Sequence, residues 1–156
     1  MLVGALKDQL KTDLVTAMKA KDDAAKSNIR MALAAIHTEE VAGNVARELT
    51  DAEETTVVTK EVNKRKDSAE AYRAGGREDL ATKEASEADF LAKYLPTPLT
   101  TDEVQALVDE EVAAASTDGE KPTMRQMGQI IKAVTARTEG RSDGKTISGM
   151  VKTALS

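Results

Sequence analysis

The sequence contains no cysteine and no tryptophan, only 3 prolines among 156 residues, and 2% aromatic residues. The lack of cysteine excludes disulfides and thiolate metal ligands and is typical of a reducing compartment, so we predict a cytoplasmic protein. Few aromatic residues and no alternating apolar pattern leave little from which to build a β-sheet. The frequent alanines favour helices instead, and the predicted fold class is all-α.

Long apolar segments are also missing. The longest runs from Met31 to Ile36, far short of the roughly 20 residues that a membrane-spanning helix needs. The segment from Leu2 to Leu6, which ends before the first charged residue, is too short for the apolar core of a signal peptide. We therefore expect a soluble, intracellular protein that does not act at a membrane.

Charge is unevenly distributed along the chain, whose formal net charge is −5. Residues 121–156 hold 7 Lys and Arg against 2 acidic residues, a net charge of +5. Residues 1–120 hold the other 15 basic and 25 acidic residues, a net charge of −10. Such an asymmetry indicates an anionic partner for the C-terminal end of the chain.

Apolar spacing and capping signals predict seven helices in two groups. In the first helix, apolar residues recur every four positions: Leu2, Leu6, Leu10, Leu14 and Met18. Thr50–Glu53 has the capping-box pattern that begins the third helix. Pro96 and Pro98 cannot continue a helix, so they mark a boundary. We predict an N-terminal bundle of about four helices, residues 1–95, and a C-terminal three-helix unit, residues 100–156.

The last 33 residues are the strongest functional candidate. Two expected helices are joined there by a tight turn, in which Gly140 follows one helix and Asp143 caps the next. Met124 begins an apolar stripe on the first of these helices, and Gly128 beside it would let another helix approach closely. Basic residues surround the helical hairpin and form the predicted nucleic-acid-binding set: Arg125, Lys132, Arg137, Arg141, Lys145 and Lys152.

Two interpretations of this basic set are equally supported by charge alone. The side chains are numerous enough to contact several phosphates, but Arg137 also suits a helix C-terminus and the turn also suits pure capping. The aromatic residues limit the kind of nucleic acid that the basic residues could bind. Tyr72, Phe90 and Tyr94 all lie outside the basic segment. Readers of single-stranded RNA stack bases on aromatic side chains. An RNA partner would therefore be a folded one, recognised by its backbone and shape.

No catalytic constellation is found in the sequence. His37 is the only histidine, and Glu40 follows it by three residues. The two could share a helix face as a metal-binding pair, but no third ligand is found nearby. The paired carboxylates fall at expected helix starts or on exposed faces, and the serines have no histidine base that can be placed beside them. No phosphate-binding loop or dinucleotide fingerprint occurs. We predict no metal and no cofactor.

Seven segments, taken together and in order, resemble the GatB/YqeY family over essentially the whole chain. They are Arg30-Met31, Arg65–Ser68, Tyr72–Leu80, Tyr94–Pro96, Met127-Gly128, Gly140–Lys145 and Val151-Lys152. The resemblance implies an all-helical protein similar to the tail of the B subunit of tRNA-dependent amidotransferases. In those enzymes the tail helps to hold the tRNA while other parts carry out transamidation of Glu-tRNA(Gln) or Asp-tRNA(Asn).

The resemblance places the expected tRNA contact on the C-terminal unit, at Arg125, Lys132, Arg137, Arg141 and Lys145. The large catalytic domain that precedes the tail in the amidotransferases is missing here. A label of carbon–nitrogen ligase with glutamine as amido donor would therefore describe the relatives, and we expect no enzyme activity of this chain's own.

The function predicted from the sequence is that of a non-catalytic, tRNA-associated helical protein of translation. Two alternatives stay open. One is an accessory subunit of an amidotransferase, enzymatic only by association. The other is a protein–protein adaptor that does not bind RNA and uses its basic rim to dock an acidic partner.

Overall fold

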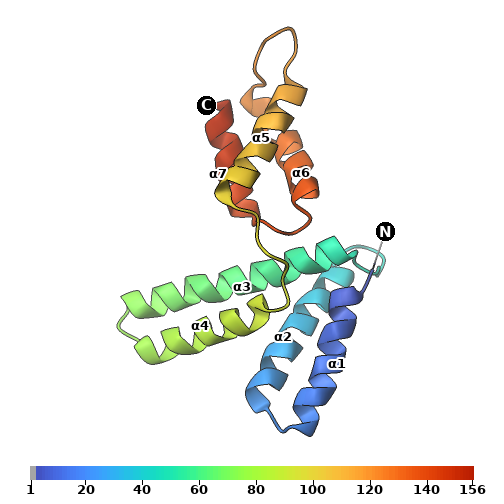
Figure 1. Ribbon diagram of the computed structural model, residues 1–156, viewed down its shortest axis with the longest axis vertical. Coiled ribbons are helices and arrows are strands. Elements are labelled where there is room, and N and C mark those ends of the chain that lie inside the picture. The colour runs from blue at the N-terminus through green and yellow to red at the C-terminus, as the bar shows by residue number, and fades with distance from the viewer. Residues whose placement is uncertain (1–2) are drawn as a thin grey trace. The chain divides into compact units, whose positions relative to one another are not determined.

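The computed structural model describes residues 3–156, which form seven α-helices and one short 3-10 helix (Figure 1). In order these are α1 (Ala5–Lys19), α2 (Asp23–Glu40), α3 (Asp51–Ala74), α4 (Glu78–Ala92), α5 (Thr101–Ala115), η1 (Met124–Gln126), α6 (Met127–Thr138) and α7 (Gly144–Leu155). Extended pairing within residues 3–156 is limited to isolated bridges. The predicted all-α fold class is confirmed.

The chain divides into two compact units, Met1–Pro96 and Thr97–Ser156, called here the first and second unit. The first contains α1 to α4 and the second contains α5 to α7. Each unit encloses an apolar core of its own. The helices of each unit therefore bury their apolar faces against one another without needing the other unit.

Two helical hairpins, α1–α2 and α3–α4, build the first unit (Figure 1). Leu10, Ile36 and Leu91 are at most 1% exposed in its core, each stabilising the fold by about 1.5–3 kcal/mol. The four-residue apolar repeat of α1 does not stay on the core, since a helix turns once every 3.6 residues. Met18 at the end of that repeat is consequently 50% exposed.

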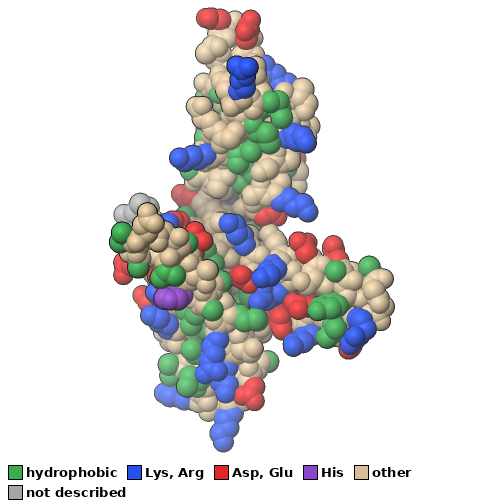
Figure 2. Space-filling model, turned by 180° about the vertical axis from the view of Figure 1, so that it is seen from behind, with side chains coloured by type: hydrophobic (Ala, Val, Ile, Leu, Met, Phe, Trp, Pro, Cys, Tyr) green, Lys and Arg blue, Asp and Glu red, His purple; other side chains and the backbone are tan. Residues whose placement is uncertain are grey.

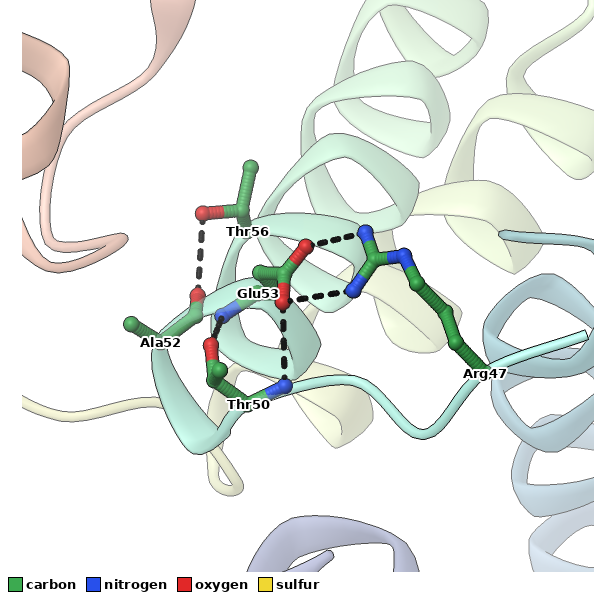
Figure 3. Close-up of polar contacts among 5 residues, drawn as sticks. All are labelled: Arg47, Thr50, Ala52, Glu53 and Thr56. Atoms are coloured by element: carbon green, nitrogen blue, oxygen red, sulfur yellow. Dashed lines mark hydrogen bonds and ion pairs between the residues drawn. The ribbon is translucent and has the colours of Figure 1, made fainter. Parts of the chain in front are cut away.

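The start of α3 has the capping box that its sequence predicts, and Figure 3 shows its bonds. The Thr50 hydroxyl accepts a hydrogen bond from the Glu53 amide, and the Glu53 carboxylate accepts one from the Thr50 amide, both at 3.1 Å. Arg47 donates to both Glu53 oxygens, at 2.9 and 2.5 Å. These bonds, with Arg47 the largest contributor, lower the pKa of Glu53 to about 2.

Carboxylates from α3 also hold the N-terminus of α1. The Asp51 carboxylate accepts a hydrogen bond from the Ala5 amide at 3.0 Å, and that of Glu54 accepts one from the Lys7 amide at 3.3 Å. They replace a local cap, because the residue before α1 makes no side-chain capping bond. Glu54 is only 1% exposed, and burial raises its pKa. This polar contact fixes the first hairpin on the second.

Valine and isoleucine side chains from three helices form the core of the second unit: Val104, Val108, Ile130, Val134, Ile147 and Val151. The Asp143 carboxylate accepts a hydrogen bond from the Thr146 amide at 2.6 Å, so the predicted cap of α7 is confirmed. Two expectations for the hairpin are wrong. Met124 lies in the 3-10 turn before α6 and is half exposed, and Gly128 has open space beside it. Gly128 lies two residues before buried Ile130 and so faces away from the core.

Candidate nucleic-acid interface

All six predicted nucleic-acid-binding residues belong to the second unit. They are Arg125 in η1, Lys132 and Arg137 in α6, Arg141 in the turn, and Lys145 and Lys152 in α7. Their surroundings divide them into two kinds. Two of them are already engaged within the unit, and four are not.

Arg137 is held by two carboxylates of α5. Its guanidinium lies 2.5 Å from a Glu110 oxygen and 3.2 Å from a Glu111 oxygen. These partners raise its pKa, chiefly through the hydrogen bond to Glu110. The two carboxylates compete with a phosphate for Arg137, and water screens this contact because the Arg137 side chain is 41% exposed.

Arg141 fastens the segment that precedes α5 to the turn between α6 and α7. Its Nε donates a hydrogen bond to the Thr97 carbonyl at 2.8 Å, and its own carbonyl accepts one from the Leu99 amide at 2.8 Å. The side chain is half-buried. Its position is therefore accounted for by the fold of the second unit.

Arg125, Lys132, Lys145 and Lys152 are exposed, and within residues 3–156 none of them pairs with a carboxylate. Lys145 and Lys152 are seven residues apart in α7, which is two helical turns and about 10 Å along the axis. Arg125 in η1 also precedes Lys132 in α6 by seven residues. Lys132 is two residues from buried Ile130, and therefore on the opposite side of α6. Figure 2 shows separate Lys and Arg side chains on the visible face of the second unit rather than one continuous basic patch.

The second unit as a whole is not basic. Thr97–Ser156 contains 7 basic and 9 acidic residues, a net charge of −2. The charges separate by helix, since α5 holds 5 acidic residues and no Lys or Arg, whereas α6 and α7 hold Lys and Arg and no acidic residue. The positive C-terminal segment thus packs against a negative helix that immediately precedes it in the sequence. The four cations without a carboxylate partner therefore lie on the elements that follow α5, which are η1, α6 and α7.

Other chemistry is sparse in the described chain. Among residues 3–156, no group of three or more His, Asp or Glu side chains is placed to hold a metal ion. His37 has 73% of its side chain exposed, and its Nδ1 lies 3.8 Å from a Glu40 oxygen. None of the helices described is both long and apolar enough to cross a membrane.

The seven helices of residues 3–156 define a small all-α protein of two units, and the second unit carries unpaired cations on η1, α6 and α7. A model of the YqeY-like protein family matches residues 7–155, and the chain belongs to this family. The resemblance drawn from the seven ordered segments is thereby confirmed.

Relatives similar to this chain are named "Altered inheritance of mitochondria protein 41, mitochondrial". The protein of Clavispora lusitaniae is 38% identical over 101 residues, which cover 64% of this chain and 58% of the relative. Those of Vanderwaltozyma polyspora and Saccharomyces cerevisiae are 41% identical over 94 residues and 40% identical over 88 residues. Both matches cover 55% of this chain and 46% of the relative, so the matched region spans about half the length of these proteins.

These names correct the predicted location. The relatives are named as mitochondrial proteins, which points to mitochondria rather than to the cytoplasm. The prediction was wrong because the lack of cysteine is a property of composition. Composition reports on which bonds the chain can form, and it does not specify a compartment.

Proposed function

We propose that this chain is a non-catalytic, tRNA-associated helical protein that contacts folded RNA through α6 and α7. The observation that carries the proposal is the set of four exposed cations without carboxylate partners in the described chain: Arg125, Lys132, Lys145 and Lys152. Family membership supports it, because the family resembles the tRNA-holding tail of the amidotransferase B subunit. Lys and Arg at such spacing neutralise backbone phosphates without reading bases.

The direction of approach follows from the charges of the second unit. The acidic residues of α5 repel a polyanion, so RNA approaches the outward faces of α6 and α7. Arg137 contributes less than the unpaired cations because Glu110 and Glu111 compete for its guanidinium. The second unit contains no aromatic side chain on which a base could stack. This supports recognition of a folded RNA by backbone and shape.

The test is tRNA binding by the full chain at two salt concentrations. If four phosphates are neutralised, the affinity falls by roughly two decades between 50 and 200 mM salt, taking the duplex slope as a guide. A variant with the four free cations reversed should lose this binding: Arg125→Glu, Lys132→Glu, Lys145→Glu and Lys152→Glu. Equal affinity of the variant and the wild type, or negligible binding by both, refutes the proposal.

A matched control separates a local site from net charge. It reverses four exposed lysines of the first unit: Lys11→Glu, Lys19→Glu, Lys60→Glu and Lys83→Glu. Both variants change the net charge by the same amount, so a general electrostatic effect would weaken both equally. The proposal requires that the first-unit variant retain most of the affinity. Reversal of Arg137 alone should have a smaller effect than reversal of Lys132 alone.

A protein–protein adaptor is the second candidate, and the charges of α5 favour it. Acidic α5 packed beside basic α6 and α7 suits a partner of mixed charge better than a long polyanion. An accessory role beside amidotransferase subunits is the form of this candidate that the family resemblance favours. It predicts co-purification with those subunits and no salt-dependent affinity for tRNA.

A further inference from the structure

An open groove of about 480 Å³ runs along α2 in the first unit. One helix supplies all of its lining residues: Asp23, Lys26, Ser27, Arg30, Met31 and Ala34. These residues recur at helical spacing, so the groove follows about three turns of α2, roughly 17 Å. The groove is a trough on the helix surface and does not enclose a small molecule.

The floor of the groove is held from behind by α3. Arg65 is buried, and its Nη2 donates a hydrogen bond to the Met31 sulfur at 3.0 Å. Arg65 is itself fixed by Glu61, 2.5 Å away, and its Nε lies 3.6 Å from Glu87. The segments Arg30-Met31 and Arg65–Ser68, two of the seven that carry the family resemblance, therefore meet here. This contact makes the floor a preformed surface.

The lining combines positive charge with apolar surface. The Lys26 ammonium forms an ion pair with the exposed carboxylate of Asp23, 2.9 Å away, at the edge of the groove. Arg30 is exposed and has no carboxylate partner in the part of the chain that the structure describes. Met31 and Ala34 supply the apolar part, and a methionine adapts its shape to a partner. The lining as a whole has a net charge of +1.

We propose that this groove binds an acidic amphipathic helix of a partner protein. Such a helix lays apolar side chains, one turn apart, on Met31 and Ala34 and presents a carboxylate to Arg30. The length of the groove fits about three turns of a helix. The interaction belongs to the first unit and does not depend on RNA binding by the second.

The apolar part of the lining argues for a helix rather than a nucleic acid. Met31 and Ala34 lie one helical turn apart on α2, where the apolar side chains of a partner helix can pack. A phosphate backbone offers no apolar surface to these two residues.

The experiment titrates an acidic helical peptide into the full chain. The probe is an 18-residue, acetylated and amidated peptide with leucines on one face and glutamates beside them. Its binding is followed by NMR in protein with labelled amides and labelled methionine methyl groups. We expect saturable shifts of the Met31 methyl and of the Ser27 and Arg30 amides, with no shift of the Met124 methyl in the second unit. A peptide with lysines in place of its glutamates should not bind.

Two variants place the peptide in the groove. Arg30→Glu should weaken binding roughly fivefold, because an exposed ion pair becomes a repulsion, and Ala34→Glu should abolish binding by placing a charge on the apolar floor. Both residues are on the surface of α2, and far-UV circular dichroism verifies folding. Lys83→Glu on α4 is the matched control and should bind like the wild type.

Three results overturn the proposal. One is the absence of saturable shifts at millimolar peptide, and another is equal affinity of the wild type and Arg30→Glu. The third is displacement of the Met31 methyl signal by tRNA but not by the peptide, which would assign the groove to a polyanion. The affinity of the second unit for tRNA is measured separately, so failure here leaves the RNA proposal untouched.

Discussion

Replacement of Arg65 by methionine tests whether the buried ion cluster holds the first unit together. The substitution preserves most of the side-chain stem and removes the charge, the bond to Glu61 and the contact with Glu87. Breaking a buried pair costs about 3–5 kcal/mol because the remaining charge has no partner. Glu61 and Glu87 keep 21% and 18% of their side chains exposed. We therefore expect a loss of about 2 kcal/mol in the free energy of unfolding.

Urea unfolding followed by tyrosine fluorescence measures this loss in the first unit alone. The sequence has two tyrosines and no tryptophan, and both tyrosines lie in Met1–Pro96. The control variant combines Arg65→Met with Glu61→Gln and Glu87→Gln, which removes the whole charge cluster. It should recover about half of the lost stability. A loss below about 0.5 kcal/mol for Arg65→Met, or equal stability of the single and triple variants, refutes the reasoning.

Three further predictions concern other polar contacts. Tyr94→Phe removes the 2.5 Å bond to Asp13 and should destabilise the first unit by about 1 kcal/mol in urea. Burial and Asp13 raise the pKa of Tyr94. The stability that the neutral phenol contributes should therefore be lost as the pH rises above 10. Absorbance at 295 nm should show that Tyr94 ionises at a higher pH than a free tyrosine. Glu53, with its pKa lowered to about 2 by Arg47, should contribute stability that is lost as pH falls from 4.5 towards that value, measurable by NMR titration. Asp143→Ala removes the cap of α7 and should lower the thermal stability of the second unit by about 1 kcal/mol, seen by circular dichroism.

Several features of the fold were predictable because they depend on residues close together in the chain. Seven helices follow from apolar spacing and from glycines and prolines that end helices. The caps at Thr50 and Asp143 connect residues three apart, and both are present. The spacing of apolar residues alone does not determine how many of them stay in the core along the length of a helix. The four-residue repeat of α1 winds away from it, and Met18 ends half exposed.

The candidate interface was only partly visible in the sequence, because charge counted along a chain ignores what folds against it. The sequence by itself determined the helical class, the caps at Thr50 and Asp143 and the family, since short-range geometry and the order of motifs carry this information. Tertiary structure alone decided which cations are free. Glu110 and Glu111 are 27 and 26 positions from Arg137 in the sequence, and both contact its guanidinium. Arg141 donates a hydrogen bond to the Thr97 carbonyl from 44 positions away. Pairings across such separations depend on how helices pack, which no local pattern encodes.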